Sequence, residues 1–402
     1  MAVLHASGRP VTRRAVIAGV GATDFSVDSG RTEAVLAVQA TLAALADANI
    51  LPSSVDGLIT FAADTTPEVV VQRNIGAQGL NYTGRSQYGG TDHCSTILQA
   101  KLAVEAGVAS RVVCYRAFNE RSGQRYGQGY GRGFGGTSAP NAETDLFAMT
   151  VPFGLLNAAG WVAMYAQRYM WLTGTTSRDL ANVSVAARAH AATNPAARFY
   201  GRPITVDDHQ ASKLIVEPLR LFDCCLETDG GVAIVVTTED IARNAGSDYV
   251  HIAGVASGSG VDQQMMATYS RDDSVMFDEI DRVARLVWER SGLEPDDIDV
   301  AILYDHFTPM VLAQLEAYGF CGRGEAKDFV ADGNIQLGGK LPVNTHGGQI
   351  GEAYIHGMNG IAEGVRQTRG TAVNQIAGAR NVLVSAPPGT PSSGLILTSA
   401  AT

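Results

Sequence analysis

The chain has 402 residues, of which 46% are hydrophobic, and a formal net charge of −10. Its length and apolar content allow a large buried core, and its acidic balance argues against a general nucleic-acid-binding protein. The five cysteines show neither a disulfide framework nor a zinc-binding spacing, which fits a reducing compartment. No apolar run approaches the length that crosses a membrane. We therefore expect a cytoplasmic protein with no membrane segment and no metal site.

Two stretches of similar pattern indicate an internal duplication. The first, at 14–59, reads as an apolar strand, a helix and a second strand, and the stretch at 249–301 repeats this order. Each continues with a glycine pair, a helix and another apolar strand, and these pairs are Gly89-Gly90 and Gly347-Gly348. Strands that alternate with helices at this spacing predict an α/β fold. The duplication predicts two pseudo-symmetric layered halves, residues 1–240 and 241–402.

A region of different composition, at about 120–220, interrupts the first half. The tract at 123–136 is rich in glycine, arginine and tyrosine and predicts a loop. Nucleic-acid binding is the alternative interpretation of this tract, but one short tract in an acidic chain is weak evidence. Helical patterns follow at 158–172 and 177–192, and then a short helix capped by Thr205. We therefore predict an inserted loop domain.

Two tyrosines in the second half lie where strands give way to helices. Tyr304 ends an apolar run that predicts a buried strand, and Thr308-Pro309 predicts the cap and first residue of a helix. Tyr304 is thus expected at the carboxyl edge of a sheet, where open α/β sheets bind ligands. Gly347-Gly348 precedes a second predicted helix, and Tyr354 is expected in the first turn of that helix. Taken alone, both could equally be packing residues.

These stretches resemble the thiolase superfamily, in the branch typified by the thiolase domain of sterol carrier protein X. That branch carries His-Asp-Cys-Phe where this chain has Tyr-Asp-His-Phe at 304–307, and Gly-His-Pro where it has Ala-Tyr-Ile at 353–355. Both histidines of the acyl-transfer site are therefore tyrosines here. The C-terminal cysteine of the branch is missing from 385–394, and the nucleophile position falls on Gly90. This set of replacements suggests a change of chemistry.

Cys94 lies about one helical turn after the nucleophile position. It would act as the nucleophile only if the helix were one turn shorter, in which case the helix dipole would favour its thiolate. A packed thiol is the simpler interpretation. A thiolase-type acyltransferase that uses Cys94 is nevertheless one alternative function, and a non-enzymatic carrier of acyl-coenzyme A or sterol is another.

Within that branch, the chain resembles the steroid side-chain aldolases of actinobacteria. The segments that match this group almost residue for residue are 115–123, 304–307, 319–329 and 344–360. The resemblance implies retro-aldol cleavage of 17-hydroxy-3-oxo-4-pregnene-20-carboxyl-CoA into androst-4-ene-3,17-dione and propionyl-CoA, without a metal or redox cofactor. It also implies a homodimeric core and a partner, the OB-fold and zinc-ribbon domain of a steroid enoyl-CoA hydratase.

The replaced residues define the expected site. A cavity without the two cysteines cannot form an acyl-enzyme, but it can bind a CoA thioester and stabilise its enolate. Tyr304 and Tyr354 are expected to act as base and acid, in an order that the sequence does not determine. A mere carrier would have no use for two phenols at these positions. The expected substrate-binding or oxyanion groups are Asn344, His346, His306 and the backbone of Gly347 and Gly348.

Overall fold

The computed structural model describes residues 13–87, 89–123, 150–263, 268, 271, 277–389 and 391–400. The strands are β1 (Ala15–Ala22), β2 (Gly57–Phe61), β3 (Tyr82–Ser86), β4 (Arg111–Asn119), β5 (Leu214–Val216), β6 (Leu219–Arg220), β7 (Asp229–Thr238), β8 (Val250–Gly258), β9 (Val300–Leu303), β10 (Asn381–Ser385) and β11 (Ser392–Ser399). The helices are α1 (Glu33–Asp47), α2 (Glu68–Ile75), α3 (His93–Glu105), α5 (Ala158–Thr173), α6 (Ser177–Thr193), α7 (Val206–Ala211), α8 (Glu239–Ala245), α9 (Asp278–Ser291), α10 (Thr308–Ala317), α11 (Ala326–Ala331), α12 (Gly348–Gly351) and α13 (Met358–Arg369).

Nine of these strands form one sheet in the order β3-β2-β4-β7-β1-β8-β11-β10-β9. In the first half, β2 is parallel to β3 and β4, while β7 is antiparallel to β4 and β1. In the second half, β9 is parallel to β10, and β11 is antiparallel to β10 and β8. The second half thus repeats the pairing pattern of the first. The halves join where β1 pairs with β8, at Val16↔His251 and Ile17↔Val250.

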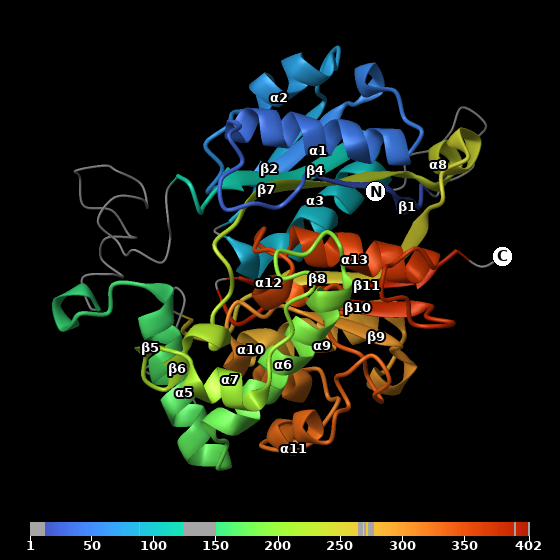
Figure 1. Ribbon diagram of the computed structural model, residues 1–402. Coiled ribbons are helices and arrows are strands. Elements are labelled where there is room, and N and C mark those ends of the chain that lie inside the picture. The colour runs from blue at the N-terminus through green and yellow to red at the C-terminus, as the bar shows by residue number, and fades with distance from the viewer. Residues whose placement is uncertain are drawn as a thin grey trace.

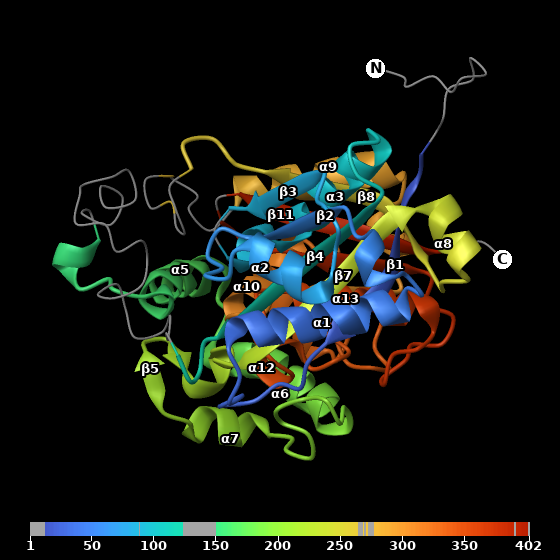
Figure 2. The same cartoon turned by 90° about the horizontal axis from the view of Figure 1, so that it is seen from above.

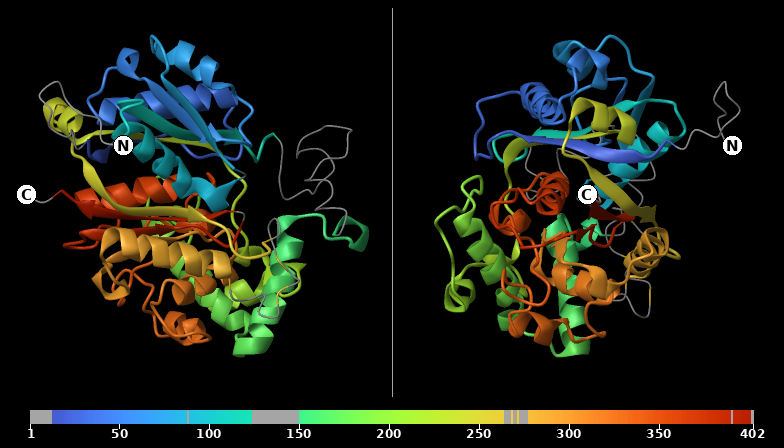
Figure 3. Two further views of the ribbon diagram at one scale, coloured as in Figure 1. Left: turned by 180° about the vertical axis from the view of Figure 1, so that it is seen from behind. Right: turned by 90° about the vertical axis from the view of Figure 1, so that its right-hand side faces the viewer.

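The two halves of the sheet are stacked with helices between and outside them. α3 and α13 lie between the two halves (Figure 1) and contact strands of both. α1 covers the outer face of the first half and α9 the outer face of the second (Figures 2 and 3). The predicted α/β layering in two pseudo-symmetric halves is confirmed. The boundary at residue 240, which falls within α8, stays a prediction.

The described part of the inserted region contains helices and the two-stranded β5-β6 sheet. α5 and α6 occupy 158–173 and 177–193, close to the predicted bounds. Thr205 caps α7, because its hydroxyl accepts the Asp208 N–H while the Asp208 carboxylate accepts the Thr205 N–H. Most of the glycine-rich tract predicted at 123–136 lies outside the described residues. None of the described helices is long and apolar enough to span a membrane.

Two local predictions are wrong. Thr308 is the first residue of α10, and Phe307 is the N-cap; the Thr308 hydroxyl donates to the Asp223 carboxylate at 2.6 Å and does not cap the helix. Tyr354 is not in a helical first turn. The backbone at Gly347 and Gly348 has φ values of 110° and 64°, and only the short α12 follows before α13 begins at Met358. Tyr354 therefore lies in the connection between the two helices.

Candidate active site

Tyr304 and Tyr354 lie side by side. Tyr304 is the first residue after β9, and Tyr354 is in the connection between α12 and α13. Their hydroxyl oxygens are 3.3 Å apart, and their rings meet edge to face with centroids 6.4 Å apart. Tyr304 is buried and Tyr354 is half-buried. The structure therefore brings together the two tyrosines that the sequence analysis singled out.

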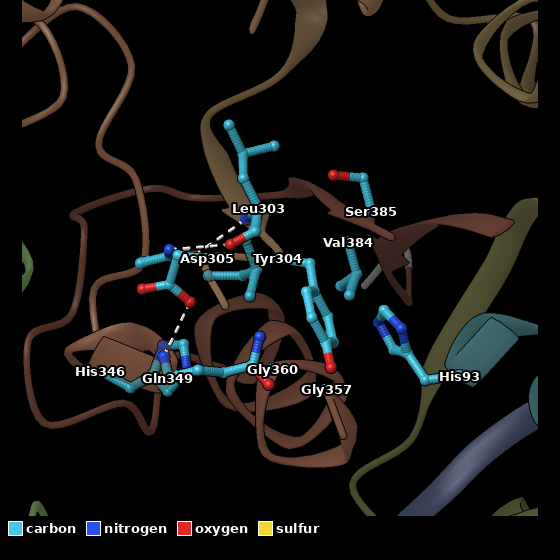
Figure 4. Close-up of a pocket in the computed structure, with 12 residues that line it drawn as sticks. His93, Leu303, Tyr304, Asp305, His346, Gln349, Gly357, Gly360, Val384 and Ser385 are labelled. Carbon is cyan, nitrogen blue, oxygen red and sulfur yellow. Dashed lines mark hydrogen bonds between the residues drawn. The ribbon is translucent and has the colours of Figure 1, made fainter. Parts of the chain in front are cut away.

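A pocket opens beside Tyr304 at the carboxyl ends of β9 and β10. Its walls come from these strands, from the N-terminus of α3 and from the segment that carries α12 and α13. Figure 4 shows the Tyr304 ring next to that of His93, and the two ring centroids are 5.5 Å apart. The lining residues are His93, Ile302, Leu303, Tyr304, Asp305, Asn344, His346, Gln349, Gly357, Gly360, Val384 and Ser385.

Gly90 packs directly against the Tyr304 phenol. It lies in the turn that leads into α3 and is buried. A Cβ atom added at Gly90 would overlap the Oη, Cζ and Cε2 atoms of Tyr304. The phenol thus occupies the space that a side chain at position 90 would need. A cysteine at this position is incompatible with the observed placement of Tyr304.

Cys94 does not line the pocket, although it contacts two residues that do. It is the second residue of α3 and has no exposed surface. Its Sγ lies 3.7 Å from the carbonyl oxygen of Val384 and 3.4 Å from the Nε2 of His93. Burial raises the pKa of its thiol, so the thiolate form is disfavoured. This geometry favours the packed thiol over the nucleophile.

The environment of both phenols favours their neutral form. Burial raises the pKa of Tyr304 well above its usual value, while the hydrogen bond with Tyr354 lowers it. Burial also raises the pKa of Tyr354 well above its usual value, and there the nearby Tyr304 adds to the increase. Neither phenol is a phenolate at neutral pH.

The histidines around the site are also neutral. Burial lowers the pKa of His306 to about 3 and the pKa values of His93 and His346 to about 4. Burial and then the Arg116 charge hold the pKa of His356 well below its usual value. The His306 ring lies 5.1 Å from the Tyr304 ring, and His346 lines the pocket. Each neutral imidazole keeps one N–H donor.

Asn344 forms hydrogen bonds with the strand that carries Tyr304. Its Oδ1 accepts the Leu303 N–H at 2.9 Å, and its Nδ2 donates to the Leu303 carbonyl at 2.8 Å. The neighbouring residue Val343 forms a parallel bridge with Ala301 of β9. The side chain of Asn344 thus extends the pairing of β9 on its outer side. This geometry gives Asn344 a structural role, and its expected oxyanion role stays a prediction.

The Asp305 carboxylate occupies the N-terminus of α12. It accepts the N–H groups of Gln349 at 2.7 Å and Ile350 at 3.4 Å. A Cβ atom at Gly348 would overlap this carboxylate, and one at Gly347 would lie 2.6 Å from the Cβ of Ala191. The glycine pair therefore allows these close approaches. The Asp305 carboxylate already binds the next two N–H groups, those of Gln349 and Ile350. The expected oxyanion role of the glycine pair itself stays a prediction.

Sequence reasoning missed two buried charged residues beside the tyrosines. Arg116 of β4 is 1% exposed, pairs with Asp64 and donates from Nε to the Nδ1 of His356 at 3.1 Å. Glu120 follows β4, is 3% exposed, and its charge contributes to the raised pKa values of both phenols. The sequence signal that could have revealed Arg116 is the presence of an arginine within the apolar run 112–118. Charged residues are rarely fully buried unless they are paired.

Comparison with known proteins identifies relatives along nearly the whole chain. The family described as thiolase C-terminal domain-like matches residues 258–398. A steroid side-chain-cleaving aldolase of Thermomonospora curvata is 56% identical, over 95% of this chain and 97% of the relative. The 17-hydroxy-3-oxo-4-pregnene-20-carboxyl-CoA lyase of Mycobacterium tuberculosis is 55% identical, over 96% of this chain and 99% of the relative. The structure of an Ltp2-ChsH2(DUF35) aldolase is 54% identical and matches with a TM-score of 0.91, over 97% of this chain and 98% of that chain.

The architecture thus defines a thiolase-fold protein. Within that class, the chain belongs to the family of the steroid side-chain-cleaving aldolases. Both the fold and the family expected from the sequence are confirmed.

Proposed function

We propose that the protein is a carbon–carbon lyase that cleaves 17-hydroxy-3-oxo-4-pregnene-20-carboxyl-CoA into androst-4-ene-3,17-dione and propionyl-CoA. The observation that carries the proposal is the pair of phenols 3.3 Å apart, at the two positions where the resemblance to the thiolase branch implies histidines. The two relatives that cover nearly the whole chain carry names of this activity. Gly90 and the buried Cys94 argue against the acyltransferase alternative.

A retro-aldol reaction needs one proton removed from oxygen and one delivered to carbon. As the β-hydroxyl loses its proton, the carbonyl of the ketone forms and the Cα–Cβ bond breaks. The electron pair of that bond passes to the thioester as an enolate, and protonation of Cα completes propionyl-CoA. No acyl-enzyme and no change of oxidation state in a cofactor is required, so we expect no cofactor.

The two phenols can move these protons without either one ionising beforehand. Tyr304 accepts the proton of the substrate hydroxyl as its own proton passes to Tyr354, and Tyr354 delivers its original proton to Cα. Both phenols are neutral again at the end. The relay agrees with the raised pKa of each phenol and with the short distance between the hydroxyls. We assign the accepting role to Tyr304 because it lines the pocket.

Neutral imidazoles are suited to hold the thioester oxygen as charge develops on it. Among the described residues, the Nδ1 atoms of His306 and His346 are buried without a hydrogen-bond partner. His346 lines the pocket, and its low pKa keeps the ring neutral. A neutral N–H donor that is already in place stabilises the negative charge that develops on the enolate oxygen. We assign His346, and secondarily His306, to this role.

The proposal includes a partner chain and a homodimer. The related solved structure is that of an Ltp2-ChsH2(DUF35) aldolase, a name that joins two components. The OB-fold and zinc-ribbon domain of a steroid enoyl-CoA hydratase is the partner that we expect, since a hydratase would supply the β-hydroxyacyl thioester. Co-expression with that domain should give a hetero-oligomer in size-exclusion chromatography. Full activity of the isolated chain would contradict a need for the partner.

The deciding experiment uses the complex and the steroid thioester. Release of androst-4-ene-3,17-dione and propionyl-CoA is followed by liquid chromatography and mass spectrometry. Tyr304→Phe and Tyr354→Phe each remove only a hydroxyl, and each should lower kcat by about 10²–10⁴-fold. If both folded variants cleave the thioester at the wild-type rate, the mechanism is wrong and a carrier function becomes the better explanation.

A further inference from the structure

The backbone of Tyr304 lies one residue beyond the regular pairing of its strand. The parallel ladder between β9 and β10 ends at the pair Leu303↔Ser385. Tyr304 then turns towards α10, so its N–H and carbonyl groups have left the ladder. A buried backbone group that has left a ladder needs another partner. For Tyr304, both partners are atoms of one side chain.

Gln314 of α10 supplies both partners. Its Oε1 accepts the Tyr304 N–H at 3.1 Å, and its Nε2 donates to the Tyr304 carbonyl at 2.8 Å. The same Oε1 accepts the Ser385 hydroxyl at 2.6 Å, and the same Nε2 donates to the Met310 carbonyl at 2.7 Å. An amide group accepts two hydrogen bonds and donates two. The side chain is therefore saturated, and only one orientation of the amide fits.

The two hydrogen bonds from Gln314 to the Tyr304 backbone form a clamp, and this clamp has a counterpart on the preceding residue. Asn344 binds both backbone groups of Leu303 in the same way. Gln314 and Asn344 are 0% and 3% exposed. Two successive residues at the end of β9 are thus each held at N–H and carbonyl by a buried side-chain amide. Such a double clamp removes the freedom that a chain normally has at a strand end.

The position of the Tyr304 phenol is tightly constrained. Its ring fills the space beside Gly90, and its hydroxyl must also reach the hydroxyl of Tyr354. A shift of about 1 Å at a reacting group can cost about 100-fold in rate. We infer that Gln314 is a positioning residue for catalysis, which holds Tyr304 through its backbone and is itself oriented by Ser385. This inference rests on the proposed function of Tyr304.

The test measures kcat and KM of Gln314→Met in the complex, in the Tyr304 and the Tyr304→Phe backgrounds. Methionine keeps the length of the side chain and removes the clamp. With Tyr304 present, kcat should fall about 100-fold while KM changes little. In the Tyr304→Phe background the same substitution should lower kcat far less, because the hydroxyl that the clamp positions is gone. A merely structural role would give the same loss in both backgrounds.

A matched control and a milder variant accompany the test. Gln367 of α13 is also a fully buried glutamine with several hydrogen bonds, but none of them reaches either tyrosine. Gln367→Met should therefore leave kcat largely unchanged in a folded protein. If Gln314→Met does not fold, Ser385→Ala replaces it, since it removes only the bond that orients Oε1. Its loss of kcat should be smaller and should again depend on Tyr304.

The outcomes separate this inference from the proposed function. A folded Gln314→Met or Ser385→Ala variant with wild-type kcat overturns the positioning role, and so does an equal loss in both backgrounds. If Tyr304→Phe itself keeps full activity, the proposed function of the tyrosine fails. In that case the clamp cannot act in catalysis either.

Discussion

Adding a methyl group at position 90 is expected to displace the Tyr304 phenol. The Cβ atom of Gly90→Ala would overlap three atoms of the Tyr304 ring and hydroxyl. Rotating the ring away is restricted, because Tyr304 is 4% exposed and its backbone is clamped by Gln314. Either the turn before α3 or the phenol must move. Overpacking of this kind typically costs about 1–3 kcal/mol of stability.

The activity should fall more than the stability suggests. Moving the phenol by about 1 Å from its place beside Tyr354 should lower kcat/KM about 100-fold. We expect the thermal unfolding midpoint of Gly90→Ala to fall while the protein remains folded at the assay temperature. Steady-state cleavage of the steroid thioester and a thermal melt measure both effects on one preparation.

A double-mutant cycle isolates the contact. In the Tyr304→Ala background the space beside position 90 is empty, so Gly90→Ala should cost little stability there. The difference between the two backgrounds should be about 1–3 kcal/mol. Equal destabilisation in both backgrounds would show that the strain lies elsewhere in the turn. Unchanged activity of Gly90→Ala with Tyr304 present would refute the steric argument.

Three further outcomes are expected. Cys94→Ala should retain most of the activity, because the proposed mechanism uses no cysteine. Peptide mapping after iodoacetamide should find no adduct at Cys94, because the thiol is fully buried. Loss of cleavage in the folded variant would restore the acyltransferase alternative. Burial raises the pKa of Asp305 to about 7 from an ordinary value near 4. The stability that this carboxyl contributes is therefore fully present below about pH 4 and is lost as the pH rises through 7. Asp305→Asn should flatten that part of the melting-temperature profile, and an unchanged slope would assign it to other groups. His346→Gln should lower kcat by about 10²–10³-fold with little change in stability if the imidazole donates to the enolate oxygen, whereas a wild-type kcat would remove it from the site.

The sequence was sufficient to predict the architecture and to single out the two tyrosines of the candidate site. The alternation of apolar strands and amphipathic helices appears twice in the chain, and it predicts the two halves because periodicity and turn residues act over a few neighbours. The capping box at Thr205 and the helices of the inserted region are local in the same sense. Tyr304 could be singled out because it ends an apolar strand, and Tyr354 because it follows a glycine pair.

Tertiary structure decided how these residues are used. The sequence placed Tyr354 in a helix, but α12 begins at Gly348 and already ends at Gly351, which leaves the tyrosine in a connection. The sequence did not indicate that the Asn344 amide binds the backbone of Leu303. The contact between Gly90 and Tyr304 joins the two halves of the chain. Sequence patterns describe neighbours along the chain, while close approach and hydrogen-bond partners depend on which distant segments meet when the sheet forms.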